Sequence, residues 1–431
     1  MNALRRSTFW GLDFIKGSPI KNHYQEIRKL IENPLADQSK KIQRDNLKRL
    51  LGHATRTTPF YEKYADRQYL EQFPVIDKNI ILRNYEDFKS VKYKGSKLYK
   101  VSSSGSTGVP FGIFQDKNKK DRNTADVIYF SGLAGGILGD RFVIIKLWDS
   151  KNKKGSLTTF LQNIHAHNVM ENSPSEISRF ISDLERDPSP KNILGYPSFY
   201  EELCNYLDGM EKAPQIKRVN TVISFAESLK DSERNRMGKY FDAPVIERYS
   251  NQENGILAQQ ARDASNTYML NWASYYFEIL KMESDQHVEK GELGRIVVTD
   301  LFNFSMPMIR YDTGDTAVYE ETVDGLPYLS SIYGRRMDTI YDEKGRIVSP
   351  HFFYMVFDFG AIKQFQFAQI GEKNYVFRLN ADKHSVHEEE IVNYFKTYLG
   401  DGATISFEYT DEIPLLSSGK RKKIVNEYKK S

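Results

Sequence analysis

Residues 102–110, with the sequence SSSGSTGVP, combine hydroxyl groups and glycines as a phosphate-binding loop does. Glycine lets a backbone turn sharply and approach a ligand closely, and successive backbone N–H groups in such turns form a concavity for anions. The Walker pattern ends in Gly-Lys-Ser/Thr, whereas here Gly108 is followed by Val109. The stretch therefore predicts a phosphate cradle that is not a P-loop or, since Ser/Gly runs are common in linkers, a flexible connection.

Three later segments carry charged groups that could act on the same nucleotide. Their sequences are PMIRYDTGD at 307–315, YGRRMDTI at 333–340 and PLLSSGKRK at 414–422. In this order, together with the Ser/Gly loop, they resemble the adenylate-forming superfamily of acyl- and aryl-CoA ligases. That superfamily reads roughly SSGSTGxPxG, then YxTGD, then GRxxD, and SGK close to the C-terminus. Four such motifs in sequence favour the phosphate cradle over the flexible connection.

Shorter segments narrow the resemblance to the phenylacetate-CoA ligase branch, including its relatives found with capsular polysaccharide genes. TPFYE at 58–62 and FPVIDK at 73–78 precede the loop as the entry segment of that branch does. GYPS at 195–198 and GELGR at 291–295 also fit it. The resemblance covers the chain from about residue 45 to the end, and its weak part is the first 40 residues.

The resemblance implies a reaction that joins a carboxylate to the α-phosphate of ATP and expels pyrophosphate. Negative charge then accumulates around one phosphorus, so the site needs donors, cations and a metal more than a base. The loop residues implied to bind the β- and γ-phosphates are Ser104, Gly105, Ser106, Thr107 and Gly108. Many superfamily members carry a lysine in this motif where the present chain has Phe111.

Two of the later motifs imply contacts to the ribose of ATP. Asp315 can accept hydrogen bonds from both ribose hydroxyls, and Arg335 is the expected second contact. The alternatives are a common Thr-Gly-Asp turn at a strand exit and a surface arginine beside Arg336.

The stretch RYSNQE at 248–253 resembles the superfamily pattern YGxTE. The resemblance implies that Tyr249 stacks near adenine and that Glu253 binds the magnesium ion bridging the phosphates, since Mg²⁺ is held by one or two carboxylates plus phosphate oxygens. Asn251 and Gln252 depart from the pattern, and a solvated helix start is the alternative. Glu227 follows a strand where the adenine-lining turn of the family is expected.

Lys420 is implied to be the catalytic lysine that reaches in from a C-terminal domain. A point charge on a flexible stem suits neutralisation of the α-phosphate and the carboxylate. The run of basic residues that follows offers a solvated basic tail as the alternative, and Lys422 is the second choice for the role. The chain keeps one acidic residue, Asp338, where the family often has two at the hinge, so a pivot is expected within 335–338.

Composition bounds the remaining possibilities. With 431 residues, the chain exceeds one ordinary core and predicts two domains. A net charge of only +4 argues against nucleic acid as a partner. No stretch approaches the length of a membrane span, and the single cysteine, Cys204, suits a reducing cytoplasm and a small buried hydrophobe. His165 and His167 have no partner at metal-ligand spacing, so we expect them in a loop or on the surface and expect no metal besides magnesium.

The hydrophobic pattern predicts an α/β fold, since short apolar runs alternate with helical segments. Strands are expected at 142–147, 219–225 and 245–249, with helices at 176–184 and 232–240. Strands at 294–299 and 316–319 are expected in a small barrel-like sheet. The resemblance implies a large N-terminal α/β domain with layered sheets over 1–335, which binds ATP and the acyl substrate. It also implies a small, mobile C-terminal α+β lid domain over 336–431.

Several functional choices stay open at this level. The acyl group could pass to CoA, to a carrier protein or to an amine of a sugar precursor. The enzyme could also stop at the adenylate, or transfer AMP itself to a small molecule. The alternative from another class is a catalytically degenerate scaffold or binding protein in polysaccharide assembly, with Asn251–Gln252 and the hinge as its support. The sequence does not identify the carboxylic acid substrate, because most aromatic residues in the expected acyl pocket are also good core residues. A homodimer is one option for the oligomeric state.

Overall fold

The computed structural model describes residues 2–103, 111–148, 155–214, 216–227, 229–262, 267–333, 340–348, 350–414 and 423–428. Of the expected site residues, 104–108, Arg335 and Lys420 lie outside this described part. The chain forms two compact units, one of Met1–Thr313 with Ala317–Ile332 and one of Gly314–Thr316 with Tyr333–Ser431.

The first unit opens with helices, as the spacing of its apolar residues predicts. Amphipathic helices bury one stripe against the core, and Leu50, Leu51 and Ala54 form such a stripe. The elements that precede the large sheet are α1 (Asn2–Ile15), α2 (Pro19–Glu32), α3 (Asp37–Thr57), α4 (Pro59–Glu62), α5 (Lys78–Arg83), β1 (Tyr99–Ser103), β2 (Phe111–Gln115) and α6 (Lys117–Leu133). Strands β1 and β2 pair antiparallel and flank the Ser/Gly loop.

An eleven-stranded sheet crosses the first unit in the order β10-β11-β12-β13-β9-β8-β7-β6-β5-β3-β4. Its strands are β3 (Arg141–Lys146), β4 (Ile164–Asn168), β5 (Lys191–Gly195), β6 (Val219–Phe225), β7 (Val245–Asn251), β8 (Gly255–Gln260), β9 (Tyr268–Leu270), β10 (Tyr275–Leu280), β11 (Leu293–Asp300), β12 (Tyr311–Glu321) and β13 (Pro327–Tyr333). Strands β4, β3, β5, β6 and β7 pair in parallel. The pairs β7–β8, β8–β9, β9–β13 and β10–β11 are antiparallel.

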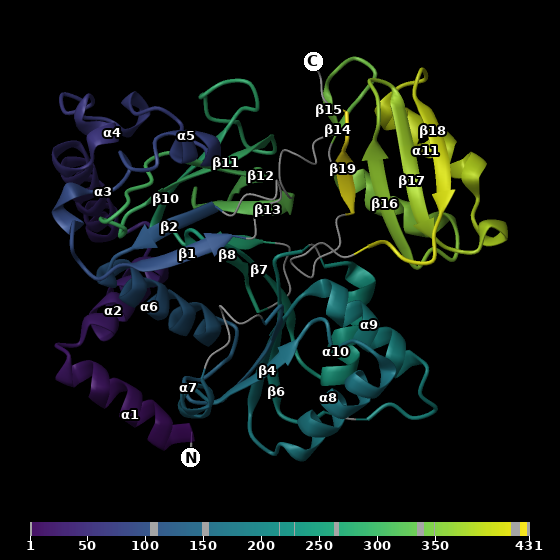
Figure 1. Ribbon diagram of the computed structural model, residues 1–431, viewed down its shortest axis with the longest axis horizontal. Coiled ribbons are helices and arrows are strands. Elements are labelled where there is room, and N and C mark those ends of the chain that lie inside the picture. The colour runs from purple at the N-terminus through teal and green to yellow at the C-terminus, as the bar shows by residue number, and fades with distance from the viewer. Residues whose placement is uncertain are drawn as a thin grey trace. The chain divides into compact units, whose positions relative to one another are not determined.

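The parallel half of the sheet is the α/β part that the sequence predicts. Its crossover helices include α7 (Ser156–Leu161), α8 (Pro174–Arg186), α9 (Pro197–Asp208) and α10 (Asp231–Phe241). Helices α8, α9 and α10 gather on one face of these strands (Figure 1). Because helices cover them, parallel strands read as apolar runs, which explains why 142–147, 219–225 and 245–249 were recognisable. The α/β fold class is confirmed.

The predicted barrel-like sheet is wrong. The strands that contain 294–299 and 316–319 are β11 and β12, and both belong to the eleven-stranded sheet and not to a separate small one. The local pattern of short antiparallel strands does not reveal this, because the sheet continues only through the pairing of β13 with β9, which lies far away along the chain.

Two expectations about single residues have opposite outcomes. Cys204 lies in α9 and is fully buried in the core that this helix shares with α8 and α10, and burial raises the pKa of its thiol to about 12. The small buried hydrophobe is therefore confirmed. His165 and His167, expected in a loop or on the surface, lie instead in β4, where His167 is buried against the rings of Phe180 and Phe199. Burial lowers the pKa of both histidines, and the His167 ring packs as an aromatic core residue.

The second unit has its own sheet and core. Strands β16 (Gln364–Gln369), β17 (Asn374–Asn380), β18 (Thr404–Tyr409) and β19 (Ile424–Asn426) pair in the order β18-β17-β16-β19, with α11 (Glu388–Leu399) alongside. Phe367 stacks on Phe353 with ring centroids 4.0 Å apart, and Phe395 packs beside them. The expected C-terminal α+β unit is present. Among the described residues of the whole chain, no helix is long and apolar enough to span a membrane.

A buried ion pair joins α6 to the antiparallel half of the large sheet. The Lys119 ammonium lies 2.7 Å from the Asp300 carboxylate, and neither side chain is exposed. Lys119 Nζ also donates to Tyr275 Oη at 2.9 Å. The helix starts here because Asp116 caps it by accepting from the Lys119 N–H, and the same carboxylate accepts from the N–H of Phe304. One helix terminus therefore organises the loop that follows β11.

Replacement of Lys119 by methionine should lower the free energy of unfolding by about 3–5 kcal/mol, because the Asp300 carboxylate stays buried without its cation. The matched control is Lys117→Met on the same helix, where the ammonium is 61% exposed and pairs with Asp121. That change should cost less than about 1 kcal/mol. Urea denaturation of both variants tests this, and equal losses would show that the buried pair has no special role.

Stability should also depend on His23. Burial, helped by the charge of Arg122, lowers the pKa of His23 from 6.5 to about 4. The unfolded chain therefore binds a proton on His23 at a higher pH than the folded chain, so stability is lost as pH falls from 6.5 toward 4. His23→Gln should reduce this pH dependence in urea denaturation, whereas His384→Gln at an exposed position should leave it unchanged. An unchanged slope in His23→Gln would contradict the assignment.

Candidate functional site

The turn between β7 and β8 carries Glu253, the expected magnesium ligand. The Asn254 N–H donates to Asn251 Oδ1 at 2.8 Å and closes the turn. Gly255 then has a φ of +111°, and a Cβ there would lie 2.9 Å from Asn123 Oδ1. Both the backbone conformation and the close approach require glycine. The expected helix start is therefore absent, and Glu253 lies on a tight β-turn.

Three side chains hold this turn from the interior. Tyr275 Oη donates to the Asn254 carbonyl at 2.5 Å, and Tyr275 is itself held by Lys119. Gln115 Nε2 donates to the Glu253 carbonyl at 3.1 Å. Asn123 Nδ2 donates to Gln115 Oε1 at 3.3 Å, which fixes the amide orientation. The buried ion pair behind the sheet therefore positions the backbone of Glu253 through a short chain of hydrogen bonds.

Strand β12 supplies the partners in front of the turn. Tyr311 Oη donates to Glu253 Oε1 at 3.0 Å, and Tyr249 Oη lies 3.2 Å from Thr313 Oγ1. Thr313 Oγ1 in turn donates to the Ile296 carbonyl at 3.0 Å. Two sequence motifs that lie some sixty residues apart along the chain are thus joined by two side-chain hydrogen bonds.

Arg310 fixes the start of β12. It is a non-glycine residue with a φ of +52°, and its guanidinium makes a buried bidentate pair with Glu278 at 2.9–3.2 Å. The guanidinium also donates to the Phe73 carbonyl at 2.9 Å, and the Arg310 carbonyl accepts from the Ile76 N–H. A strained residue persists only where its surroundings determine it. The segment FPVIDK at 73–78 therefore holds in place the strand that carries Tyr311 and Thr313.

Asp315 lies two residues beyond Thr313 in the same strand. Gly314 between them has a φ of +79°, and nothing lies within 4 Å of where its Cβ would be. The left-handed residue breaks the regular alternation of side chains just before Asp315. Asp315 is half-buried and takes part in interactions of its own. A carboxylate at such a bend is suited to accept hydrogen bonds from a pair of hydroxyls.

Glu227 has a structural contact that the sequence did not suggest. Its carboxylate accepts from the Ser198 N–H at 2.9 Å and from Ser198 Oγ at 3.3 Å, and so caps the N-terminus of α9. Ala226 just before it has a φ of +70°. Burial, with the charge of Glu227 nearby, raises the pKa of Tyr196 to about 12. The turn at 225–227 is thus tightly held, and the Glu227 side chain is directed to the helix.

The donor set around Glu253 fits a hard divalent cation held mainly by phosphate oxygens. Within the described residues, no three His, Cys, Asp or Glu side chains cluster as a metal site. Glu253 Oε1 accepts from Tyr311, and Oε2 accepts no hydrogen bond from a described residue. A single carboxylate is typical of Mg²⁺ bound together with a nucleotide, whereas protein-only cages suit Ca²⁺ or Zn²⁺.

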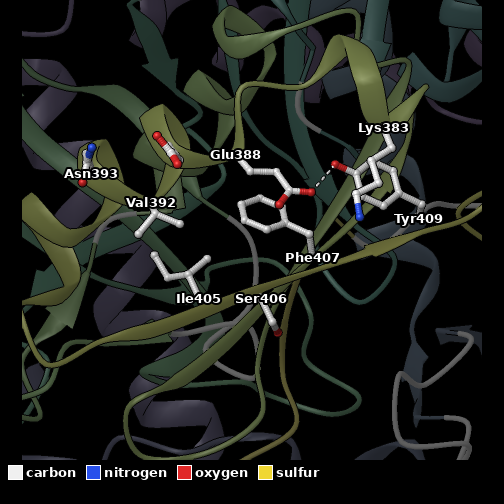
Figure 2. Close-up of a pocket in the computed structure, with 9 residues that line it drawn as sticks. Lys383, Glu388, Val392, Asn393, Ile405, Ser406, Phe407 and Tyr409 are labelled. Carbon is white, nitrogen blue, oxygen red and sulfur yellow. Dashed lines mark hydrogen bonds between the residues drawn. The ribbon is translucent and has the colours of Figure 1, made fainter.

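A separate hollow of about 650 Å³ lies on the second unit, between α11 and the edge strand β18 (Figure 2). It is lined by Lys383, Glu388, Glu389, Val392, Asn393, Ile405, Ser406, Phe407 and Tyr409. Tyr409 Oη donates to Glu388 Oε1 at 2.7 Å across one end. None of the residues expected to do chemistry lines this hollow.

Sequence reasoning missed most of the groups that hold Glu253 in place. Tyr311 and Thr313 were part of a recognised motif but had no assigned role, and their positions two apart on a strand are the signal that both face the same side. Lys119, Asp300 and Tyr275 left no signal, because a buried ion pair between distant segments has no sequence pattern. Outside the described residues, 104–108, Arg335 and Lys420 stay predictions.

Comparison with known sequences identifies relatives of the whole chain. Residues 340–427 match the family described as the CapK C-terminal domain. The chain is similar to the protein CapK of Staphylococcus aureus, with 22% identity over 447 residues that cover 97% of this chain and 95% of that protein. It is also similar to phenylacetate-coenzyme A ligase of Pseudomonas putida, with 23% identity, covering 74% of this chain and 76% of the relative.

Comparison with solved structures supports the fold. A crystal structure of 2-hydroxyisobutyryl-CoA ligase in the postadenylation state, in complex with R3-HIB-AMP, matches with a TM-score of 0.70. The sequence identity is 15%, and the match covers 91% of this chain and 90% of that chain. A benzoate CoA ligase from Burkholderia xenovorans LB400 matches with a TM-score of 0.51 at 16% identity, covering 72% of this chain and 65% of that chain.

A double-mutant cycle on Tyr311→Phe and Glu253→Ala should give a coupling energy of about 1–2 kcal/mol in urea denaturation, because the hydroxyl donates to a charged oxygen. The matched control replaces Tyr311→Phe by Tyr319→Phe, since Tyr319 lies in the same strand and donates to Glu321 instead. Its coupling to Glu253→Ala should be within error of zero. Equal coupling in both cycles would contradict a specific contact.

Proposed function

Because the chain is a homologue of CapK and the phenylacetate-CoA ligases, with the fold of the adenylate-forming acyl- and aryl-CoA ligases, we propose that it is an adenylate-forming ligase. Its reaction is the ATP- and Mg²⁺-dependent activation of a carboxylic acid as an acyl- or aryl-adenylate. The sequence resemblance to that superfamily, drawn from the four motifs, is confirmed by these relatives.

The observation that carries the proposal is the pair of hydrogen bonds between the β7–β8 turn and β12. Tyr311 orients the Glu253 carboxylate, and the hydroxyl of Tyr249 is hydrogen-bonded to that of Thr313. Nucleotide activation needs a metal ligand in a defined orientation, which the hydrogen bond from Tyr311 provides. Glu253 on the turn would be that ligand, and Asp315 in β12 would contact the ribose.

In the proposed first step, a carboxylate oxygen of the acid attacks the α-phosphorus of ATP. The bond from that phosphorus to the oxygen bridging to the β-phosphate breaks, and pyrophosphate leaves with the electron pair. Glu253 would hold Mg²⁺, which neutralises charge on the phosphates when bound. Asp315 and Arg335 would hold the ribose, Tyr249 would stack near adenine, and the turn at Glu227 would line the adenine.

Two further groups act on the phosphates in the proposal. Residues 104–108 would donate backbone and hydroxyl hydrogen bonds to the β- and γ-phosphates and then to pyrophosphate. Lys420 would neutralise the charge that develops between the α-phosphate and the carboxylate, which is the stabilisation that phosphoryl chemistry most needs.

In the proposed second step, the acyl group passes to CoA. The CoA thiol releases its proton to water, its sulfur attacks the acyl carbonyl carbon, the bond from that carbon to the phosphate oxygen breaks, and AMP leaves with the electron pair. A carrier protein or the amine of a sugar precursor is the alternative acceptor. The use of ATP and CoA suits a cytoplasmic enzyme, and the likeness to CapK supports a role in capsular polysaccharide biosynthesis.

The competing functions differ in their products. A degenerate scaffold would need none of the charged groups, yet Glu253 and Asp315 are retained and Glu253 is oriented by a dedicated hydroxyl. Retention of costly half-buried carboxylates favours an active enzyme. An enzyme that transfers AMP to its substrate would leave AMP covalently attached, which separates it from a ligase.

Pyrophosphate release from ATP and Mg²⁺ should depend on an added carboxylic acid in a panel of acyl and aryl acids. Lys420→Ala should slow the release by about 100-fold or more, since it removes a cation that acts mainly in the transition state. CoA should raise the release further and yield a thioester with free AMP. ATP binding without any acid-dependent release across a broad panel, or an unchanged Lys420→Ala rate, would contradict the proposal.

Glu253→Gln should raise the Mg²⁺ concentration needed for half-maximal pyrophosphate release by about tenfold or more, because the amide is a much weaker ligand for a hard cation. The control is Glu176→Gln, whose side chain caps α8 by accepting from the Ser173 N–H and has no proposed part in nucleotide or metal binding. That variant should keep the wild-type Mg²⁺ dependence while it loses some stability. The same Mg²⁺ dependence in wild type and Glu253→Gln would remove Glu253 as the ligand.

A further inference from the structure

Helix α1 exposes apolar residues on the side where a surface helix normally places polar ones. The exposed fractions are 70% for Leu4, 53% for Leu12, 76% for Phe14 and 80% for Ile15. Leu4 and Ile15 lie eleven residues apart, which is three turns of a helix, so they share one face. We call Leu4, Leu12, Phe14 and Ile15 the outer face of α1.

The opposite side of the helix is anchored, so the outer face is not an accident of a loosely attached segment. Trp10 packs on Tyr24 of α2 with ring centroids 5.9 Å apart. The Asp13 carboxylate is buried and accepts from the N–H groups of Ile20 and Lys21 at 3.1 and 2.9 Å. Two independent contacts therefore fix the rotation of α1 about its axis, and with it the direction of the outer face.

The apolar surface continues onto α7. Phe160 and Leu161 are 65% and 60% exposed. The guanidinium of Arg5 lies 5.5 Å from the centre of the Phe160 ring, and α7 lies beside the N-terminal end of α1 (Figure 1). Six large exposed apolar side chains thus lie on two neighbouring helices, and exposed apolar residues that gather in this way mark an interaction surface.

The charges around this surface are all of one sign on α1. Arg5 flanks the face at Phe160, and Lys16, which directly follows α1, is exposed. The only acidic residue of α1 is Asp13, which is buried and engaged by backbone N–H groups. A second copy placed on this face would bring basic residues against basic residues, whereas an anionic surface would complement them.

We propose that the outer face of α1, with Phe160 and Leu161, docks the protein on an anionic lipid surface. Leucine, phenylalanine and isoleucine enter the boundary between headgroups and acyl chains, and Arg5 and Lys16 beside them pair with lipid phosphates. This is the arrangement of an interfacial helix, which lies in the plane of the membrane and does not cross it. The attachment is peripheral and independent of the proposed chemistry.

The test is co-sedimentation of the full chain with vesicles of phosphatidylcholine containing phosphatidylglycerol, compared with vesicles of phosphatidylcholine alone. Wild type should partition at least about tenfold more strongly onto the anionic vesicles, and added salt should weaken the binding. Leu4→Gln combined with Phe14→Gln should reduce the partition coefficient by about tenfold or more, because two apolar side chains no longer enter the boundary.

Two further variants separate the contribution of the basic residues to vesicle binding from that of the apolar face. Arg5→Gln with Lys16→Gln keeps the apolar face and should reduce binding to the anionic vesicles. Val323→Gln, at a fully exposed valine in the turn after β12, makes the same type of change elsewhere and should bind as wild type does. Circular dichroism of each variant checks that α1 and the core remain folded.

Several results would overturn the proposal. Equal binding of wild type to both vesicle types would exclude a role for lipid charge. No binding to either vesicle type would exclude docking on lipid. Wild-type binding by Leu4→Gln/Phe14→Gln would exclude the outer face. A wild-type dimer in light scattering that this variant converts to a monomer would show that a second copy covers the face instead.

Discussion

The buried pair of Lys119 and Asp300 is the interaction on which the candidate site depends. Two opposite charges without solvent contact are costly unless their hydrogen bonds are complete. Here the ammonium also donates to Tyr275, whose hydroxyl donates to the Asn254 carbonyl beside Glu253. The Phe302 N–H donates to Asp300 Oδ1, whereas Asp300 Oδ2 has the Lys119 ammonium at 2.7 Å and no hydrogen bond from a described residue. The pair thus belongs to a network that ends at the turn carrying the expected metal ligand.

This network explains how a short turn can hold a charged side chain in a defined orientation. The backbone of the turn is fixed from inside by Tyr275 and Gln115, and the carboxylate of Glu253 is fixed from outside by Tyr311. Arg310 in turn fixes Tyr311 through its buried pair with Glu278. Rigid support of this kind lets a site bind a nucleotide with little reorganisation.

The sequence predicts the fold class and the parallel strands well, because buried parallel strands and amphipathic helices carry strong local patterns. It also identifies Glu253 and Asp315 as the charged residues of two motifs. It predicts poorly where the outcome depends on distant partners. The barrel-like sheet was wrong for this reason, and His167 was misplaced because its burial depends on Phe180 and Phe199.

The cap formed by Glu227 illustrates a second limit. A carboxylate after a strand suggested a ligand contact, and the same carboxylate satisfies the backbone N–H of Ser198 at the start of α9. Pairing of this kind between a loop and a helix terminus is set by tertiary position, since the two residues lie 29 apart in the chain. Local sequence therefore identifies the charged candidate residues, but it does not identify the partners that these residues contact.

The most direct measurement is a crystal structure of the protein with Mg²⁺ and a non-hydrolysable ATP analogue. The account predicts a Glu253 carboxylate oxygen about 2.0–2.1 Å from the metal and Asp315 within about 3.2 Å of the ribose hydroxyls. The bond between Tyr311 and Glu253 should be retained. A nucleotide bound away from β12, or a metal held without Glu253, would contradict the account.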